Sequence, residues 1–464
     1  MVAALVQFLG FTNYDADTAY HLAVARLTAA HGILHAFPWT PFSWLSDHYA
    51  DKEFLFHLML VPLASQRLDL VSKLVGTVLD SILLCEIYGI LSSGGVERAG
   101  IWTLLAVTAS GYFTMRLALV RPFIVAIALS LGIVWASSRR RLLLLGALCF
   151  LYPLSYVAWH TSLVLVVLVE LALLLSGQRP SWKTIAVTIT GLAAGLLVHP
   201  NFPTILVSFW EENVGVLMQS AWGHAGLDLG SEVRPWTLNA WLRFALVPFL
   251  LATTALAVSF RRRRERPLDF AFALTAMAFV VLTLPTQRFT EYSVPFSAVA
   301  FALAFGREAP RSLAAIMVGG TALFTALFGR VPIAALGTRG EDIPAPVAQV
   351  LQQLVAPDAQ VFTCGWGLTG ELMLALPERR FMVALGPTYF LRKDPELYQL
   401  WHDLVRTRSS HPAQVVRDRF HARYVLCEHL PEWAAFIQSV EADPEATPLL
   451  RGPLWHLAEV KSRH

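Results

Sequence analysis

Long apolar segments recur along this 464-residue chain as far as Leu336, and they constrain its fold more than any other feature. A helix that crosses the hydrocarbon core of a bilayer needs about 20 mostly apolar residues. About ten segments approach this length. They cover 73–92, 100–117, 122–137, 142–158, 162–176, 184–200, 238–260, 268–286, 291–306 and 311–329. We therefore expect a polytopic α-helical membrane protein of about ten spans plus juxtamembrane helices.

The composition agrees with a membrane protein and excludes other classes. Charged residues make up only 15% of the chain and the mean hydropathy is +0.53, whereas soluble domains are about 25% charged. Such a chain is not intrinsically disordered. The net charge of +3 is too small to indicate a nucleic-acid partner.

Basic clusters follow alternate apolar segments. They lie at 139–141, 179–183, 261–266 and 307–311, with the weaker Arg98. If each segment crosses the membrane once, all these clusters fall on one side, which the positive-inside rule makes cytoplasmic. We therefore expect the first loop, the loops 199–236 and 287–292 and the tail to be extracytoplasmic, in a protein of the inner (cytoplasmic) membrane.

The sequence becomes polar after Leu336. We take this change as the boundary between a transmembrane domain, 1–336, and a soluble extracytoplasmic α/β domain, 337–464. Short β-like runs alternate with helical ones in this tail and favour a largely parallel sheet. The expected strands are 361–364, 381–385, 423–427 and 455–460. Cys364 and Cys427 lie in such runs, either as a disulfide pair or as core thiols.

Two shorter apolar stretches lie near the start of the chain. Phe54–Ala64 is too short to span and reads as a helix along the membrane interface. Met1–Phe11 is also short and lacks a basic start and a cleavage site, so it does not read as a signal peptide. Either it is a partial first helix that dips into the membrane, or the chain begins further upstream.

The first outer loop, 13–57, concentrates acids and histidines. Asp15 and Asp17 lie two apart, so in an extended stretch both would point to one face. Two such carboxylates can bind a divalent cation, or one can act as a base whose pKa the other tunes. The simpler alternative is a hydrated loop in which Asp17 caps a helix.

The order of motifs adds to this evidence. The first loop carries Asp15 and Asp17, Tyr20-His21, Phe37-Pro38-Trp39 and then Asp51-Lys52-Glu53-Phe54-Leu55-Phe56-His57. Placed before a many-helix body and a polar tail, this order resembles the GT-C superfamily of membrane glycosyltransferases. That superfamily includes oligosaccharyltransferase catalytic subunits, protein mannosyltransferases and aminoarabinose transferases. An acid in the first extracytoplasmic loop is catalytic in it, and two juxtamembrane helices follow.

The resemblance implies an enzyme that moves a sugar from a polyprenyl-phosphate-linked donor to an acceptor on the extracytoplasmic side. Asp15 and Asp17 would be catalytic, with one of them accepting the proton of the acceptor. Further substrate contacts are expected from residues on the outer side. These are His21, Glu53, His57, Arg116, Arg121, Arg288, Glu291 and Tyr292.

The outer arginines run against the positive-inside trend and need a reason. Guanidinium groups bind phosphate through paired donors, so Arg116, Arg121 and Arg288 are candidates for holding the polyprenyl-phosphate head group. The alternative is that they snorkel to membrane lipid head groups or pair with Glu291.

The chain departs from the family pattern in two places. Oligosaccharyltransferases carry a second acidic motif between two early helices, but 116–122 contains no acid here. A Mg or Mn ion on Asp15 and Asp17 is therefore left open. Gly365-Trp366-Gly367 is only faintly similar to the family's Trp-Trp-Asp-Tyr-Gly motif, so recognition of a glycosylation sequon is not carried over.

Two rival functions remain at this point. A transporter or flippase of lipid-linked sugars would use Asp80 and Glu86, and helices broken around Asp80 would favour it. A non-catalytic membrane subunit would leave Asp15 and Asp17 apart and facing bulk water.

Overall fold

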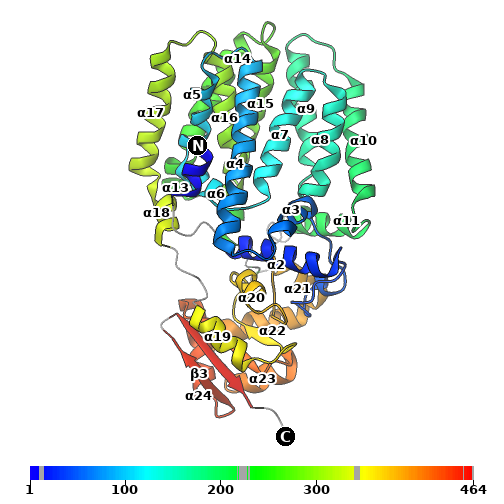
Figure 1. Ribbon diagram of the computed structural model, residues 1–464, viewed down its shortest axis with the longest axis vertical. Coiled ribbons are helices and arrows are strands. Elements are labelled where there is room, and N and C mark those ends of the chain that lie inside the picture. The colour runs from blue at the N-terminus through cyan, green and yellow to red at the C-terminus, as the bar shows by residue number, and fades with distance from the viewer. Residues whose placement is uncertain are drawn as a thin grey trace.

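The computed structural model describes residues 1–9, 15–216, 218, 227, 230–338, 345–452 and 454–461. It has a helical bundle at one end and a smaller mixed α/β tail at the other (Figure 1). The bundle contains α4 (Leu68–Ser93), α5 (Ala99–Thr108), α7 (Phe123–Ser138), α8 (Leu142–Ser155), α9 (Thr161–Leu175), α10 (Trp182–Val198), α14 (Leu246–Arg261), α15 (Pro267–Leu282), α16 (Thr290–Phe305) and α17 (Arg311–Phe328). Their apolar side chains form the largest core.

The lengths of these helices bear on the number of spans. Within the described residues, α4 and α17 are each long and apolar enough to cross a membrane. Two bent pairs raise the number to four if each pair is one span: α6 (Gly111–Ala118) with α7, and α13 (Leu238–Phe244) with α14. The other apolar helices are shorter, so a count of about ten spans stays a prediction.

The expected segment 100–117 is two helices. α5 ends at Thr108, and the Ser110 side chain caps α6 by accepting from the Phe113 amide. A Cβ on Gly111 would lie 2.1 Å from the Gly329 carbonyl oxygen, so only glycine allows this close approach. α6 then meets α7 at 115°, and Arg121 lies in the turn between them.

The predicted basic clusters meet at one end of the bundle. Side chains of one loop bond to a neighbouring loop or helix end in the pairs Arg98–Ala309, Arg140–Arg179, Arg263–Leu175 and Arg266–Glu308. Helix α2 (Ala16–His31) and the tail lie at the opposite end (Figure 1). This arrangement is the one that alternate crossings require.

The sheet of the tail is mixed, so the expectation of a largely parallel sheet is wrong. Its strand order is β1 (Val361–Thr363), β2 (Tyr424–Glu428), β4 (Trp455–Val460), β3 (Ala446–Arg451). The β1–β2 pair is parallel, but β2–β4 and β3–β4 are antiparallel. The few residues between β3 and β4 are too short for the crossover that a parallel pair needs.

The expected strand 381–385 does not form. The preceding Arg380 makes an isolated parallel bridge to Gln360 beside β1, but the Phe381 amide donates to the Trp39 carbonyl oxygen of the first loop at 2.6 Å. The helices of the tail are α19 (Ala345–Leu354), α20 (Thr369–Ala375), α21 (Thr388–Lys393), α22 (Pro395–Arg406), α23 (Pro412–Phe420) and α24 (Ala434–Ala442).

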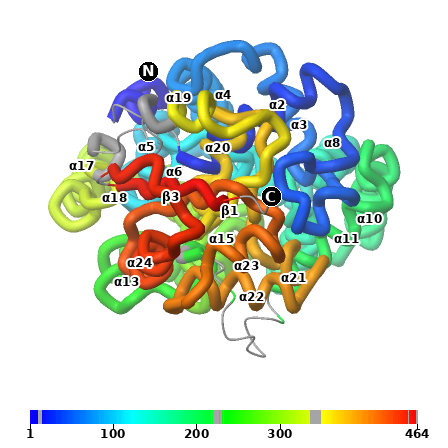
Figure 2. Tube along the Cα trace, turned by 90° about the horizontal axis from the view of Figure 1, so that it is seen from below, coloured from blue at the N-terminus to red at the C-terminus, as the bar shows by residue number. Residues whose placement is uncertain are grey.

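The first loop and the tail share one hydrophobic core. Buried residues of the first loop, Tyr20, Val24, Phe37 and Trp39, pack with Leu372, Phe381, Tyr389, Tyr424 and Leu457 of the tail. Figure 2, which looks onto the tail, has α20 close to α2. A Cβ on Gly370 would lie 1.9 Å from the Ala16 carbonyl oxygen, so α20 approaches the first turn of α2 closely.

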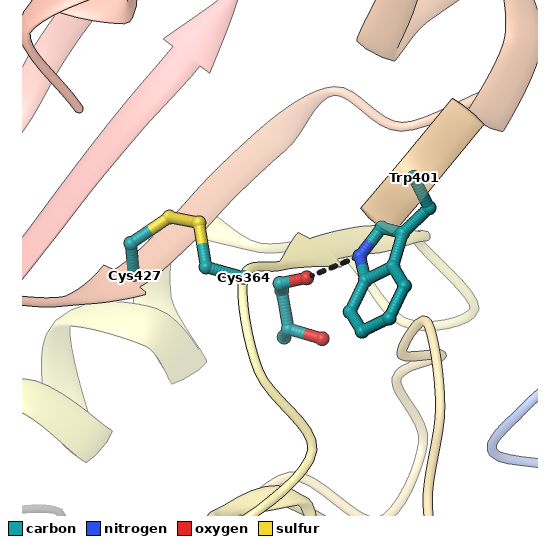
Figure 3. The surroundings of a disulfide bond; sticks show 4 residues. Cys364, Trp401 and Cys427 are labelled. Carbon is teal, nitrogen blue, oxygen red and sulfur yellow. Dashed lines mark hydrogen bonds between the residues drawn. A yellow bond between two sulfur atoms is a disulfide. The ribbon is translucent and has the colours of Figure 1, made fainter. Parts of the chain in front are cut away.

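The candidate cysteine pair is a disulfide. Cys364, which directly follows β1, is bonded to Cys427 on β2 (Figure 3). The Trp401 indole beside it donates to the Thr363 carbonyl oxygen at 3.0 Å. Cys85 and Cys149 are free thiols.

Candidate functional site

Asp15 caps helix α2. Its Oδ1 accepts hydrogen bonds from the Thr18 amide at 3.0 Å and the Thr18 hydroxyl at 2.9 Å. The two acids therefore do not lie in an extended stretch, and the cap is Asp15 instead of Asp17, which lies in the first helical turn. Asp is a strong N-cap residue, and the sequence that follows it is rich in alanine and leucine. Both features favour a helix that begins here.

Both carboxylates nevertheless meet at one guanidinium. Arg121 Nε donates to Asp15 Oδ2 at 3.1 Å, and Nη2 contacts the same oxygen. Arg121 Nη1 lies 2.5 Å from Asp17 Oδ2. The structure thus brings together the two predicted acids and one predicted arginine, and neither acid faces bulk water alone.

Glu232 extends this group to a second arginine. Its Oε1 lies 3.4 Å from Arg121 Nη1 and 2.6 Å from Arg116 Nη1. Arg116 Nη2 is in turn 2.5 Å from Glu291 Oε1. Glu232, in the short helix η4 (Ser231–Val233), was missed from the sequence. Its only signal there was an acid in an outer loop opposite outer arginines.

Arg288, on the short helix η5 (Gln287–Phe289), hydrogen-bonds to a tyrosine of the bundle. Its Nη2 donates to the Tyr156 hydroxyl at 2.9 Å. Tyr292 packs inside the bundle, where its ring stacks on Phe279 with centroids 5.0 Å apart. Among the described residues, these ion pairs join the predicted Asp15, Asp17, Arg116, Arg121 and Glu291, but not Arg288 or Tyr292. The predicted His21, Glu53 and His57 lie in a second cluster. We call Asp15, Asp17, Arg116, Arg121, Glu232 and Glu291 the acid–arginine cluster.

The acids of this cluster titrate differently. Burial favours the neutral form of Asp15, but the Arg121 guanidinium and the Thr18 amide outweigh it and hold its pKa well below the usual range. Desolvation, together with the charges of Asp15 and Glu232, outweighs Arg121 at Asp17 and raises the pKa of that carboxyl. The Asp17 side chain remains 47% exposed, so a substrate can reach it.

A second cluster gathers around His21 and His57. His57 Nδ1 is 2.7 Å from Asp51 Oδ1, and His57 Nε2 is 2.8 Å from His21 Nδ1. His21 comes from α2, and His57 from α3 (Phe54–Leu60). Glu53 lies beside them, and burial raises its pKa to about 7. One ligand atom each of His21, Glu53 and His57 lies within 4.8 Å of the others.

A Mg or Mn ion on Asp15 and Asp17 would compete with Arg121, which already contacts both carboxylates. Both oxygens of Asp15 already accept hydrogen bonds, one from Thr18 and one from Arg121. Arg121 also occupies Asp17 Oδ2. The guanidinium thus supplies the positive charge that a cation would bring to these carboxylates.

Lys52 ties the first loop to two other segments. Its ammonium lies 2.7 Å from both oxygens of Glu212, and the Tyr389 hydroxyl donates to Glu212 Oε1 at 2.7 Å. The short helix η3 (Trp210–Gly215), which carries Glu212, and helix α21 of the tail therefore hold the first loop in place.

The features named for the rival functions are not present in the described residues. α4 runs unbroken through Asp80, whose Oδ2 accepts from Gln7 of α1 (Val2–Gln7) at 2.8 Å. Asp15 and Asp17 meet at Arg121 instead of lying apart.

Comparison with known proteins gives matches at the level of the fold. No family model and no curated protein matches the chain. Among solved structures, ArnT from Cupriavidus metallidurans bound to undecaprenyl phosphate has a TM-score of 0.64 at 11% identity, and the match covers 98% of this chain and 96% of ArnT.

Two further structures match. The archaeal oligosaccharyltransferase AglB from Archaeoglobus fulgidus, in complex with an inhibitory peptide and a dolichol-phosphate, has a TM-score of 0.60 at 14% identity over 95% of this chain and 70% of AglB. The arabinofuranosyltransferase AftD from Mycobacteria has a TM-score of 0.60 at 16% identity over 100% of this chain and 41% of AftD. All three share one architecture with this chain.

Proposed function

This chain has the fold of the GT-C superfamily of membrane glycosyltransferases, and from that premise we propose that it transfers a sugar from a polyprenyl-phosphate-linked donor to an acceptor at the extracytoplasmic face of the inner membrane. The acid–arginine cluster carries this proposal. It gathers four acids and two arginines from distant parts of the sequence at the end of the bundle that bears the tail.

In the proposed reaction, Asp17 is the general base. The oxygen of the acceptor attacks the anomeric carbon and gives its proton to the Asp17 carboxylate, while the bond from that carbon to the phosphate oxygen breaks and its electron pair leaves with the phosphate. The raised pKa and the exposure of Asp17 suit a base, since proton acceptance improves as the pKa approaches the working pH. Asp15 stays ionised and fixes Arg121.

The arginines would stabilise the leaving group. Arg116 and Arg121 both contact one oxygen of Glu232, so an anion between them is already accommodated. We propose that the donor phosphate takes the place of this carboxylate, with Arg288 nearby as a third cation. Removing one such group in other enzymes lowers kcat by about 10²–10³-fold.

The proposal needs no Mg or Mn ion on Asp15 and Asp17, because Arg121 balances their charge. The remaining predicted contacts, Glu291 and the cluster around His21, would help to hold the sugar or the acceptor. The basic loops at the far end of the bundle support the assignment of the tail and the site to the extracytoplasmic side.

The test measures carrier-lipid release. Purified protein is incubated with radiolabelled polyprenyl-phosphate sugars and acceptors, and release of free carrier lipid reports transfer. We expect Asp17→Asn to reduce turnover by at least about 10²-fold, the lower end for loss of a general base. Asp15→Asn should also reduce turnover, because Arg121 then loses the carboxylate that fixes it. Asp47→Asn, at an exposed acid of the same loop, is the matched control.

Two results would contradict the proposal. One is full transfer by both variants in folded form. The other is movement of the labelled lipid across vesicles by the wild-type protein without release of free carrier, which would support the transporter.

A further inference from the structure

We propose that His21, Glu53 and His57 form a binding site for a zinc-class metal ion, separate from the acid–arginine cluster. The three residues are 4%, 5% and 0% exposed, and one ligand atom from each lies within 4.8 Å of the others. The evidence for this site does not rest on the reaction proposed above.

An unsatisfied oxygen points to a missing ligand. Glu53 Oε2 is buried and has no hydrogen-bond partner among the described residues, and the Lys52 ammonium is 4.0 Å from the other oxygen. A buried carboxylate oxygen without a partner is costly, and such an atom in a native structure calls for an explanation. A cation between Glu53 and the two imidazoles would satisfy it.

The set of ligands selects the class of metal. Two imidazole nitrogens and one carboxylate match sites in which Zn²⁺ keeps an open fourth position. Mg²⁺ prefers oxygen ligands throughout, so it is disfavoured here.

Asp51 already orients one of the proposed ligands, His57. Asp51 Oδ1 lies 2.7 Å from His57 Nδ1, which leaves His57 Nε2 directed at His21. A carboxylate on the far nitrogen is the usual partner of a metal-bound histidine. Asp51 is itself fixed, because its amide donates to Asn201 Oδ1 at 3.0 Å and its carbonyl oxygen lies 3.1 Å from His199 Nε2.

Small movements suffice to admit the ion. His21 Nδ1 and His57 Nε2 are 2.8 Å apart. Zinc–nitrogen bonds of about 2.0–2.1 Å at a tetrahedral angle hold two nitrogens roughly 3.3 Å apart. The two rings therefore need to separate by roughly half an ångström, a shift that side-chain rotation provides.

The bound ion would join two elements of the first loop. His21 lies on α2, whose N-cap is Asp15, whereas Glu53 and His57 lie at the start of α3. An ion held by all three cross-links α2 to α3 and fixes the orientation of the helix that presents Asp15 and Asp17.

The test measures metal content and stability. Full-length protein is purified without a polyhistidine tag, and its metal content is determined by mass spectrometry. We expect about one zinc ion per chain for the wild type, as in a mononuclear site. His57→Gln, His21→Gln and Glu53→Gln should lose most of it. His48→Gln, at an exposed histidine of the same loop, should keep it.

A second measurement uses the wild-type protein alone. Removal of the ion with EDTA should lower the Tm, and added Zn²⁺ but not Mg²⁺ should restore it. The proposal is overturned if the wild type holds no zinc and its Tm does not respond to added Zn²⁺, or if the three variants bind as much zinc as His48→Gln. Glycosyl transfer enters neither readout, so failure here is distinct from failure of the proposed function.

Discussion

Arg121 controls the charge of the candidate catalytic acids, because it contacts both Asp15 and Asp17. Its positive charge lowers the pKa of each carboxyl, and its loss raises both. A base must be ionised to accept a proton, so activity is lost as the pH falls through its pKa. We therefore expect Arg121→Gln to move the acid limb of kcat/KM to higher pH.

The measurement is a pH profile of kcat/KM for wild type, Arg121→Gln and Arg121→Lys. The lysine variant keeps the charge and should keep the acid limb near that of the wild type. For the wild type, the midpoint of the acid limb should lie above about pH 3.9, the ordinary pKa of an Asp side chain, because the pKa of Asp17 is raised. Identical limbs in all three proteins would remove Arg121 from this role.

Glu232 competes with the donor phosphate in the proposed reaction. Glu232→Gln removes the negative charge that Arg116 and Arg121 share, so the phosphate meets less competition. We expect a several-fold lower KM for the polyprenyl-phosphate donor, measured by initial rates. Glu97→Gln, at an exposed acid next to the basic Arg98, is the control. A higher KM for Glu232→Gln would instead indicate that this carboxylate binds substrate.

For individual residues, the sequence predicts which charged side chains belong to the candidate site better than it predicts which side chains they pair with. Asp15, Asp17 and the outer arginines were found because charges are scarce in an apolar chain and need a reason. The partner of Arg288 was open, and Glu232 was missed, because pairing depends on how distant loops meet. Neither the periodicity nor the spacing of residues in the sequence predicts which distant loops come into contact.

Helix α20 is a positioning element for α2. A Cβ on Gly370 would lie 1.9 Å from the Ala16 carbonyl oxygen, and backbone cannot yield as a flexible side chain does. We expect Gly370→Ala to push α20 from α2, destabilise the protein by about 1–3 kcal/mol as overpacking does, and lower turnover. Gly367→Ala is matched to it, because nothing lies within 4 Å of that added Cβ.

Thermal unfolding in detergent and the carrier-lipid assay check this prediction. If Gly370→Ala and Gly367→Ala unfold at the same temperature and turn over equally, the contact of α20 with α2 has no role in holding the site.

Individual elements followed the sequence where a local pattern is strong. Apolar runs indicated most bundle helices, but the break between α5 and α6 rests on Ser110 and on the approach of Gly111 to Gly329, a contact distant in sequence. The run 381–385 is apolar enough for a strand, yet its first amide bonds to Trp39. Tertiary contacts override propensity in such short runs.

The whole molecule has two chemically different ends, the basic loops of the bundle and the tail. The disulfide bears on which side of the membrane the tail occupies. Cys364 and Cys427 close a loop of 63 residues in the tail, and disulfides persist in oxidising compartments. We expect a membrane-impermeant maleimide to label these two cysteines in intact cells only after reduction. Labelling only after permeabilisation would contradict an extracytoplasmic tail. Cys85 and Cys149, in the bundle, should stay unlabelled.

Removing that crosslink should also weaken the tail. A disulfide typically contributes about 2–4 kcal/mol, so the double variant Cys364→Ser with Cys427→Ser should unfold at a lower temperature. The same fall is expected in wild-type protein treated with a reductant, and an unchanged Tm in both would contradict it.

The core shared by the first loop and the tail has a consequence for biogenesis. Tyr20 and Phe37 emerge from the ribosome before the bundle helices, whereas Leu457, which packs in the same core, is made after all of them. Chains fold broadly from the N-terminus during synthesis. Here the apolar side chains of the first loop stay partly exposed until the bundle helices and the tail that packs on them have been made. The candidate site is therefore completed only after β4 has been made, so a translation product that stops short of β4 carries Asp15 and Asp17 without the packing that orients them.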